Sequence, residues 1–358
     1  MRRGWSDAKA SAVIDIPAPS RLRLDGNALV SNWRALDRMS GRAACGAAIK
    51  ADGYGLGAEG VATRLAAAGC RDFFVATWHE AAALGSLQLP LSVLHGVRAE
   101  DMLAARAGIA RPVLNTAAQV ARWREAGGGL CDVMIDTGMN RLGVSAEEIG
   151  AGLLDGLAID TLMSHLACAD EDAAMNEHQR MAFAALTGRT AARRMSLANS
   201  AGIGLGTDYA FDLTRPGLAL YGGVPRAEMA DVLRQVVYPE AQVLQRRRVR
   251  AGESVGYNAT WIASEDSEIA IINIGYADGY ARAFSDAGQA EFGGVKLPVI
   301  GRVSMDLTAV DVTAMPSVQE GDWIAINFAL PHAAAASGRS QYELLTSIGC
   351  RYEQVWTD

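Results

Sequence analysis

The chain has 358 residues, of which 50% are apolar, and its formal net charge is −7. This length exceeds one ordinary domain and suits one large domain plus a smaller one. The acidic balance argues against a general nucleic-acid binder, which normally carries a basic surface.

The N-terminal segment, residues 1–24, is expected to form an arm or strand. Its two arginines are followed by no apolar stretch, so no signal peptide is expected. No run in the chain approaches the ~20 apolar residues that span a bilayer. The five cysteines are scattered without a CxxC pair, which indicates neither a zinc site nor a disulfide framework. We therefore expect a cytoplasmic protein with free, buried thiols, no metal and no membrane partner.

From residue 25 to 240, short apolar runs alternate with Ala-rich segments of helical spacing. The runs are almost continuously apolar, which is typical of strands covered on both faces. They lie at residues 45–50, 72–77, 92–95, 112–115, 132–136, 160–164, 195–198 and 217–221, and helices are expected at 27–39, 58–68, 116–126 and 173–186. Eight such units predict an α/β fold, a (β/α)8 TIM-type barrel. An open doubly wound sheet is the alternative, but its glycine fingerprint is missing.

From residue 241 to 358 the pattern is that of a mostly-β domain. Residues 241–250 are basic and alternating, and further β-type runs lie at 268–274, 289–292, 295–300, 307–312 and 323–328. Gly293 and Gly294 separate two of these runs, as a two-residue hairpin turn does. An Ala-rich stretch at 333–337 is typical of the start of a late helix.

Polar residues end or follow several of the predicted barrel strands, and one of them, Arg215, enters the eighth. They are Lys50, Arg141, His165, Asn199, Ser200 and Arg215. Because the active sites of (β/α)8 barrels lie at the C-terminal ends of the strands, we expect these side chains to converge on one rim.

Lys50 is the first candidate for chemistry. Desolvation at the mouth of an apolar barrel lowers the pKa of a lysine and exposes the free amine that forms a Schiff base. A solvated loop lysine is the alternative. The segment DGYGLG at 52–57 places three glycines around Tyr54, which indicates a backbone that approaches a ligand closely, although a plain turn is also compatible.

The other candidates are weaker when each is taken alone. Arg215 offers a rigid donor fork that keeps its proton, and beside a pyridine nitrogen it would leave that nitrogen unprotonated. His165 alone is more often a core histidine, Asn199 a capping residue, and Tyr257 in the turn-rich SVGYN at 254–258 a surface tyrosine.

Together, the motifs resemble the alanine racemase family from about Pro19 to Val355. They are AAIKADGYGLGA, SHLACAD, ANSAG, RPGLALYG, VGYNATW, GYADGY and GRVSMD. The resemblance implies a (β/α)8 barrel with a C-terminal β domain, pyridoxal 5'-phosphate (PLP) as cofactor, and a head-to-tail homodimer with shared active sites that acts on a small amino acid.

The resemblance also implies roles for individual residues. Lys50 is similar to the PLP lysine, Arg215 to the arginine at the pyridine nitrogen, and Arg141 to the arginine that places the substrate carboxylate. The other cofactor positions are Tyr54, Asn199, Ser200, Gly217, Leu218 and Tyr221. The substrate-pocket positions are Tyr276, Met305 and Asp306.

Racemisation removes the α-proton from one face and returns a proton to the other, which favours two bases. The resemblance implies Lys50 for the D face and Tyr257 of the partner subunit for the L face. A tyrosine ordinarily loses its proton near pH ~10. We therefore expect a chain from Tyr257 through His165 to Arg215 to supply positive charge.

Two positions depart from the family pattern. Many members carry a carbamylated lysine where this chain has Met134, and some carry a phosphate-contacting tyrosine where it has Cys350. The alternatives are a serine-preferring or broad-specificity racemase, a PLP decarboxylase or aldolase, a non-catalytic PLP-binding protein, and a PLP-free phosphate-binding barrel enzyme.

Overall fold

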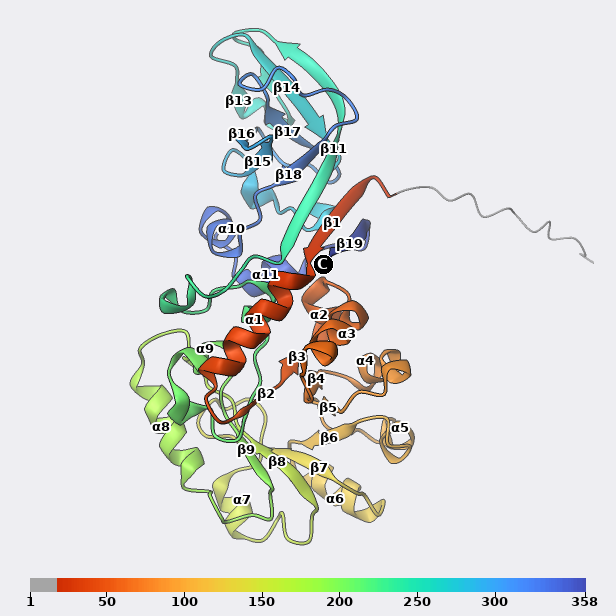
Figure 1. Cartoon of the computed structure of the whole chain (residues 1–358), viewed down its shortest axis with the longest axis vertical. Coiled ribbons are helices and arrows are strands. Elements are labelled where there is room, and N and C mark those ends of the chain that lie inside the picture. Colours follow the sequence, from red (N-terminus) through yellow and green to blue (C-terminus); the bar gives the residue numbers. More distant parts are fainter. Residues whose placement is uncertain (1–17) are drawn as a thin grey trace, which may run out of the picture.

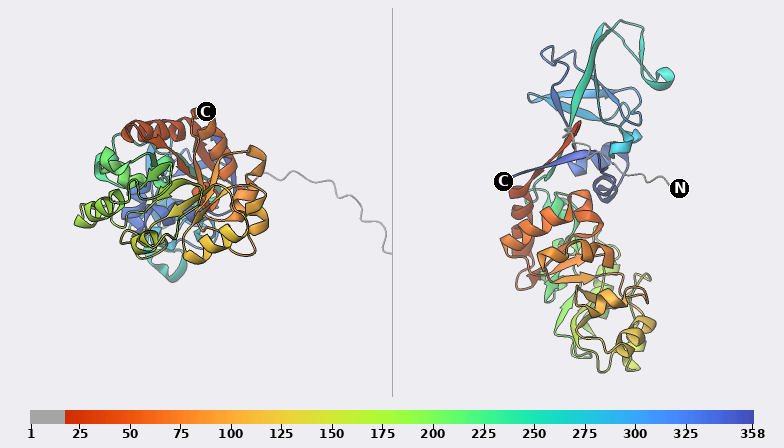
Figure 2. Two further views of the ribbon diagram at one scale, coloured as in Figure 1. Left: turned by 90° about the horizontal axis from the view of Figure 1, so that it is seen from below. Right: turned by 90° about the vertical axis from the view of Figure 1, so that its right-hand side faces the viewer.

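The computed structural model describes residues 18–358 and arranges them in two lobes, a barrel and a β domain stacked along the long axis (Figure 1). The side view in Figure 2 shows how elongated this arrangement is. The first seventeen residues of the expected N-terminal arm lie outside the described part of the chain, and so does the segment inspected for a signal peptide. No helix among the described residues is long and apolar enough to cross a membrane.

The barrel is built from parallel strands. Seven pair in sequence order: β3 (Ala47–Ala48), β4 (Phe73–Val75), β5 (Leu91–Val93), β6 (Arg111–Leu114), β7 (Cys131–Met134), β8 (Ile159–Met163) and β9 (Arg194–Ser196). The eighth, β10 (Leu213–Thr214), pairs with β2 (Ala44–Cys45). Two backbone hydrogen bonds close the ring, from Arg215 N–H to Ala198 O (2.9 Å) and from Ala48 N–H to Pro216 O (2.8 Å). The predicted (β/α)8 barrel is confirmed.

Helices surround this ring, as the view along the long axis in Figure 2 shows. They are α1 (Gly26–Met39), α3 (Ala58–Ala68), α4 (Trp78–Ala83), α5 (Met102–Arg106), α6 (Ala117–Glu125), α7 (Ala146–Gly150), α8 (Ala174–Ala184) and α9 (Ser200–Gly204). Side-chain caps fix several helix starts, for example Thr116, whose hydroxyl accepts from Gln119 N–H at 3.2 Å.

Two predicted strands need correction. Residues 217–221 are not a strand: the eighth strand lies earlier, and Leu218–Tyr221 form a 3₁₀ helix, η3, with Leu220 N–H donating to Gly217 O (2.9 Å). The run is apolar because η3 is buried, and a short apolar run does not distinguish a buried strand from a buried helical turn. The predicted strand 45–50 is divided into β2 and β3 and ends before Lys50.

A buried ionic cluster fills the N-terminal end of the barrel. Arg194 binds Asp72 and Asp160 (2.7 and 2.6 Å), and Arg111 binds Asp160 at 2.9 Å. Asp132 lies beside Arg111 (3.5 Å) and accepts from the Ser92 hydroxyl. The cluster lies at the end of the strands opposite the rim where the candidate residues converge.

The second lobe is a ring of antiparallel strands. β11 (Val237–Val249) pairs with both β18 (Trp323–Ile326) and β14 (Ser267–Ile272). The ring continues through β17 (Thr308–Asp311), β16 (Val295–Ile300) and β15 (Gln289–Phe292). The two strands of the β15–β16 hairpin meet at the predicted Gly293–Gly294 turn. Outside it, β12 (Ser254–Val255) pairs with β13 (Trp261–Ile262).

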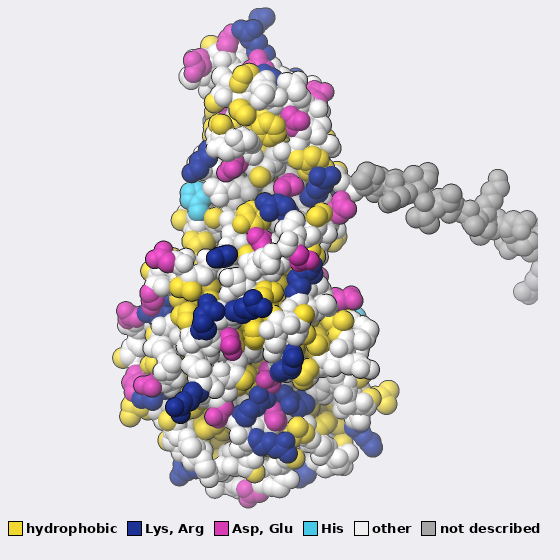
Figure 3. Space-filling model, in the orientation of Figure 1, with side chains coloured by type: hydrophobic (Ala, Val, Ile, Leu, Met, Phe, Trp, Pro, Cys, Tyr) yellow, Lys and Arg dark blue, Asp and Glu magenta, His cyan; other side chains and the backbone are white. Residues whose placement is uncertain are grey.

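Three connections tie the lobes together. β1 (Ser20–Asp25) joins the second lobe, antiparallel to β11 and parallel to β19 (Tyr352–Thr357). β11 runs through the expected boundary at residue 240. After α10 (Leu330–Ser337), α11 (Gln341–Thr346) returns to the barrel and contacts α2 (Lys50–Gly55). Figure 3 shows side chains of both charges interspersed over one face of both lobes.

Candidate active site

A cavity of about 510 Å³ opens at the C-terminal ends of the barrel strands. The residues around it include nine of the predicted ones: Lys50, Tyr54, Arg141, His165, Asn199, Ser200, Arg215, Gly217 and Leu218. They come from segments after five different strands, β3, β7, β8, β9 and β10, so closure of the barrel is what brings them together.

Lys50 lies where β3 passes into a left-handed turn. Residues 51–54 have φ between 52° and 63°, and the Glu80 carboxylate holds the turn by accepting from Ala51 N–H (2.9 Å) while it also accepts from Ala76 N–H (2.6 Å). Burial lowers the pKa of Lys50, and the positive charges of Arg141 and Arg215 lower it further against the opposing charge of Glu80. The amine is thus more readily deprotonated than that of a surface lysine.

Tyr54 and Gly217 meet at one end of the cavity. A Cβ at Gly217 would lie 2.1 Å from the Tyr54 hydroxyl, so only glycine leaves room for it. The Ser200 hydroxyl accepts from the N–H groups of Gly217 (2.9 Å) and Ala219 (3.2 Å), and Asn199 caps α9 by accepting from Gly202 N–H at 2.8 Å. Burial raises the pKa of Tyr54, which keeps this hydroxyl a donor. Two hydroxyls and a glycine backbone at close range suit a phosphate.

Arg215 is fixed in the cavity wall. Its guanidinium donates to the Ser196 hydroxyl and to Ser164 O (2.5 Å). Burial lowers the pKa of Arg215 to about 10, while the charge of Asp132 opposes this. The group therefore stays protonated at neutral pH and presents a fixed donor.

His165 lies in the same cavity as a neutral imidazole. Burial, followed by the charges of Arg215, Arg141 and Lys50, lowers the pKa of His165 to about 3. Within residues 18–358 no hydrogen bond joins the imidazole to Arg215. Their coupling here is electrostatic, whereas the sequence analysis expected a direct chain.

Arg141 lies on a loop that is closed on itself. Asp136 accepts from three successive N–H groups, those of residues 138–140, at 2.8, 2.9 and 3.1 Å. Val144 N–H donates to Met134 O (2.9 Å) and ties the end of the loop to its start. The loop is ordered by its own contacts and carries the guanidinium to the cavity.

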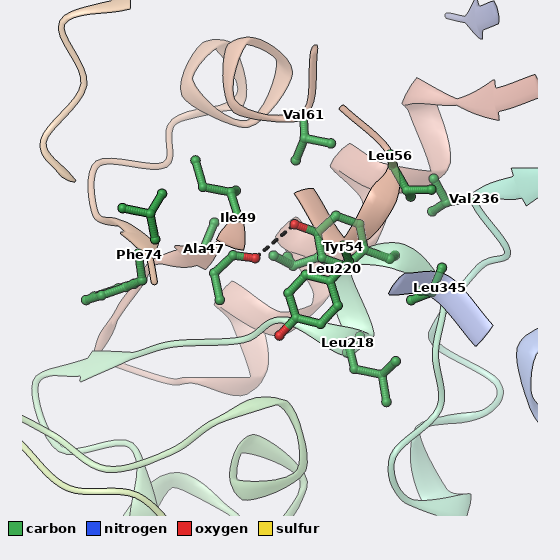
Figure 4. Packing of buried hydrophobic residues seen from close by; sticks show 14 of the residues in the cluster. Ala47, Ile49, Tyr54, Leu56, Val61, Phe74, Leu218, Leu220, Val236 and Leu345 are labelled. Atoms are coloured by element: carbon green, nitrogen blue, oxygen red, sulfur yellow. Dashed lines mark hydrogen bonds between the residues drawn. The ribbon is translucent and has the colours of Figure 1, made fainter. Parts of the chain in front are cut away.

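Five predicted site residues do not line this cavity. Tyr221 is buried behind it, where its hydroxyl donates to Ala48 O (2.8 Å) and its ring lies 4.7 Å from that of Tyr54. Figure 4 shows the apolar packing around Tyr54 with Leu218 and Leu345. The other four lie exposed on the β lobe: Tyr257, Tyr276, Met305 and Asp306.

The sequence analysis missed several residues that line the cavity. His95 and Asn115 are the last residues of the predicted strands 92–95 and 112–115, so the rule that selected Lys50, a polar residue that ends an apolar strand, would have found them. Tyr342 had no such signal, because it comes from α11, far along the chain from the barrel strands. Gln341 in the same helix forms two 2.8 Å hydrogen bonds with the backbone of Val224, and these hold α11 against the barrel. Cys350 is exposed, unlike the expected buried thiols, and is not among the lining residues.

Comparison with known proteins covers both lobes. Residues 24–225 match the family model "Alanine racemase, N-terminal domain", and residues 236–356 match "Alanine racemase, C-terminal domain". An alanine racemase of Acidiphilium cryptum is 45% identical over 351 residues, which cover 93% of this chain and 98% of that relative.

Solved structures agree with this result. The alanine racemase of Bartonella henselae, solved with covalently bound pyridoxal phosphate, matches with a TM-score of 0.87 and 35% identity over 95% of this chain and 100% of that one. The biosynthetic alanine racemase of Pseudomonas aeruginosa matches with a TM-score of 0.87 and 31% identity over the same shares.

Proposed function

Because this chain belongs to the alanine racemase family of PLP-dependent isomerases, we propose that it interconverts L-alanine and D-alanine at the cavity of its barrel. The observation that carries the proposal is Lys50, a lysine of lowered pKa in a cavity that also holds a buried arginine and a hydroxyl-lined end.

The residues present fit the cofactor. Lys50 would hold PLP covalently, and Tyr54, Ser200, Gly217 and Leu218 would hold its phosphate, since the missing Cβ of Gly217 leaves room for the Tyr54 hydroxyl at this end of the cavity. Arg215, which stays protonated, would donate to the pyridine nitrogen, and Tyr221 supports the ring of Tyr54 from behind. Asn199 fixes the short helix that carries Ser200.

Two residues would move the proton. Bound PLP withdraws electrons from the α-carbon and makes its proton acidic enough to remove. Lys50 would exchange that proton on the D face, and Tyr257 of the partner subunit on the L face. The field of Lys50, Arg141 and Arg215 that acts on His165 would also favour loss of the proton from a phenol brought beside it.

We propose a head-to-tail homodimer because the site is incomplete within one chain. Tyr257 is 68% exposed on the β lobe and lines no part of its own chain's cavity. In the dimer, Tyr276, Met305 and Asp306 would complete the substrate pocket of the partner. We also propose residues 25–240 as the PLP-binding unit, 241–358 as the β domain with 1–24 as an arm, and a cytoplasmic location without nucleic-acid or membrane partners.

The direct test is chiral chromatography of the PLP-loaded protein after separate incubation with L-alanine and L-serine. D-alanine that forms faster than D-serine supports the proposal, and racemisation of serine alone would reassign the substrate. Borohydride reduction followed by peptide mapping should place the cofactor on Lys50, and Lys50→Ala should abolish the attachment. Cofactor found on another lysine would overturn the site assignment.

A further inference from the structure

Asn115 lies at the C-terminal end of β6 and lines the cavity, yet no step described so far uses it. Its side chain is fully buried, and its Nδ2 donates to Leu94 O (3.0 Å) and Val113 O (2.8 Å). These two bonds fix which end of the amide is nitrogen and which is oxygen. The oxygen, Oδ1, is buried and accepts no hydrogen bond from any residue in the described part of the chain.

A buried acceptor without a donor destabilises the protein, because it has lost its hydrogen bonds to water and gained none. Such an atom in the wall of a binding cavity therefore indicates a donor that arrives there when the site is assembled.

Arg141 is the candidate donor, because it lines the same cavity as Asn115. β6 and β7 pair with Leu114 opposite Val133, so Asn115 lies beside Met134, and the loop that carries Arg141 is tied to Met134 by the bond from Val144. Neighbouring strands are about 4.8 Å apart, less than the length of an extended arginine side chain. Between residues 18 and 358 the Arg141 guanidinium has no hydrogen-bond or ion-pair partner, and Met134 offers only a thioether.

We propose that Asn115 is the positioning residue for Arg141: Oδ1 of Asn115 accepts a hydrogen bond from the guanidinium and directs it toward the carboxylate of the amino acid. The inference rests on the proposed function, since it assigns Arg141 to that carboxylate. It explains how a neutral cavity wall supports this arginine.

The test compares Asn115→Ala with Asn115→Asp in the PLP-loaded enzyme. Both variants lose the two Nδ2 bonds, but only the aspartate keeps an acceptor at this atom. Propionate, which has the carboxylate of alanine without its amino group, is the probe, and calorimetry measures its Kd without turnover. We expect Asn115→Ala to raise the Kd for propionate about tenfold, which corresponds to about 1.4 kcal/mol. Asn115→Asp should bring the Kd back to the wild-type value. The KM for alanine should rise with the Kd while kcat changes by less than about twofold.

Asn176 provides a matched control. It is buried, its Nδ2 also donates to two backbone carbonyls, those of Cys168 and Glu171, and its Oδ1 also lacks a described partner, but it lies outside the cavity. Asn176→Ala should leave the Kd for propionate unchanged. In an Arg141→Ala background, Asn115→Ala should cause no further loss.

An equal loss in the Arg141→Ala background, or no loss in the wild-type background, would overturn the role of Asn115. If Asn115→Ala does not yield folded protein, as judged by its melting temperature, the comparison of Asn115→Asp with wild type decides: propionate binding lost in that variant contradicts the proposal. Wild-type enzyme that binds propionate through Arg141 but racemises no alanine would instead refute the proposed function and leave this inference standing.

Discussion

The hydroxyl of Tyr54 reaches the cavity only because residue 217 has no side chain. The left-handed turn at residues 51–54 aims Tyr54 at the backbone of Gly217, and Tyr221 supports its ring from the other side. In the sequence these residues belong to separate motifs, whereas the structure brings them into a single contact that shapes one end of the cavity.

Gly217→Ala is therefore expected to displace the Tyr54 hydroxyl. The new methyl group cannot coexist with an atom at 2.1 Å, and we expect the Kd for PLP to rise about tenfold, the loss typical of one hydrogen bond to a charged group. Titration of the apoenzyme with PLP, followed by absorbance, measures this. Gly150→Ala, at a position with open space around it, should not change the Kd, and an unchanged Kd in Gly217→Ala would contradict the proposed phosphate site.

The low pKa of His165 in the folded protein predicts that the free energy of unfolding depends on pH. The folded protein lowers the pKa of His165 from 6.5 to about 3, so below pH 6.5 only the unfolded chain takes up this proton, and stability falls as the pH decreases. Between pH 7 and 5 the loss from this group amounts to about 2 kcal/mol. Urea unfolding should show that His165→Asn loses less stability over this interval than wild type. The exposed His178 provides the control: His178→Asn should keep the wild-type pH dependence.

At the scale of elements, the ionic cluster at the N-terminal end of the barrel should contribute to stability without affecting the site. Arg194 binds two carboxylates that are about nine-tenths buried. Arg194→Leu leaves both without this partner, and breaking such a pair costs about 3 kcal/mol. Denaturant unfolding should show this loss while PLP content stays unchanged. Arg180→Leu, which breaks the exposed pair with Glu177, should cost much less because water screens that pair. Equal losses in the two variants would contradict the role of the cluster.

Hydrophobic patterning predicted most of the barrel, since strands β4 to β9 each overlap a predicted apolar run. The patterning failed at residues 217–221, where the short apolar run forms a buried 3₁₀ helix. That segment is apolar because it is buried, and its sequence shows no period that would distinguish a strand from a helix. It also missed Tyr342, since α11 reaches the cavity through a tertiary contact between segments more than a hundred residues apart. The rim positions His95 and Asn115 were predictable in principle, because each is the polar last residue of a predicted strand.

At the scale of the whole molecule, the site residues fall into two groups that a single chain does not unite. One group surrounds the barrel cavity, and the other, with Tyr257, lies exposed on the second lobe. The resemblance assigned both groups to one chemistry, but patterns along a chain carry no information about which copy of the chain supplies each residue. Only an experiment that mixes two kinds of subunit addresses that question.

Mixing Lys50→Ala with Tyr257→Phe provides that experiment. In a head-to-tail dimer, one of the two sites in a mixed pair receives Lys50 from one subunit and Tyr257 from the other, while the second site lacks both. Random exchange makes about half of the dimers mixed, so activity should recover to about a quarter of the wild-type value, although each variant alone is nearly inactive. In the control, the double variant Lys50→Ala/Tyr257→Phe is mixed with wild type. Every mixed dimer then lacks Lys50 in one site and Tyr257 in the other, so activity should fall. Absence of recovery, once mass spectrometry has shown that subunits exchange, would mean that Tyr257 does not act across the interface.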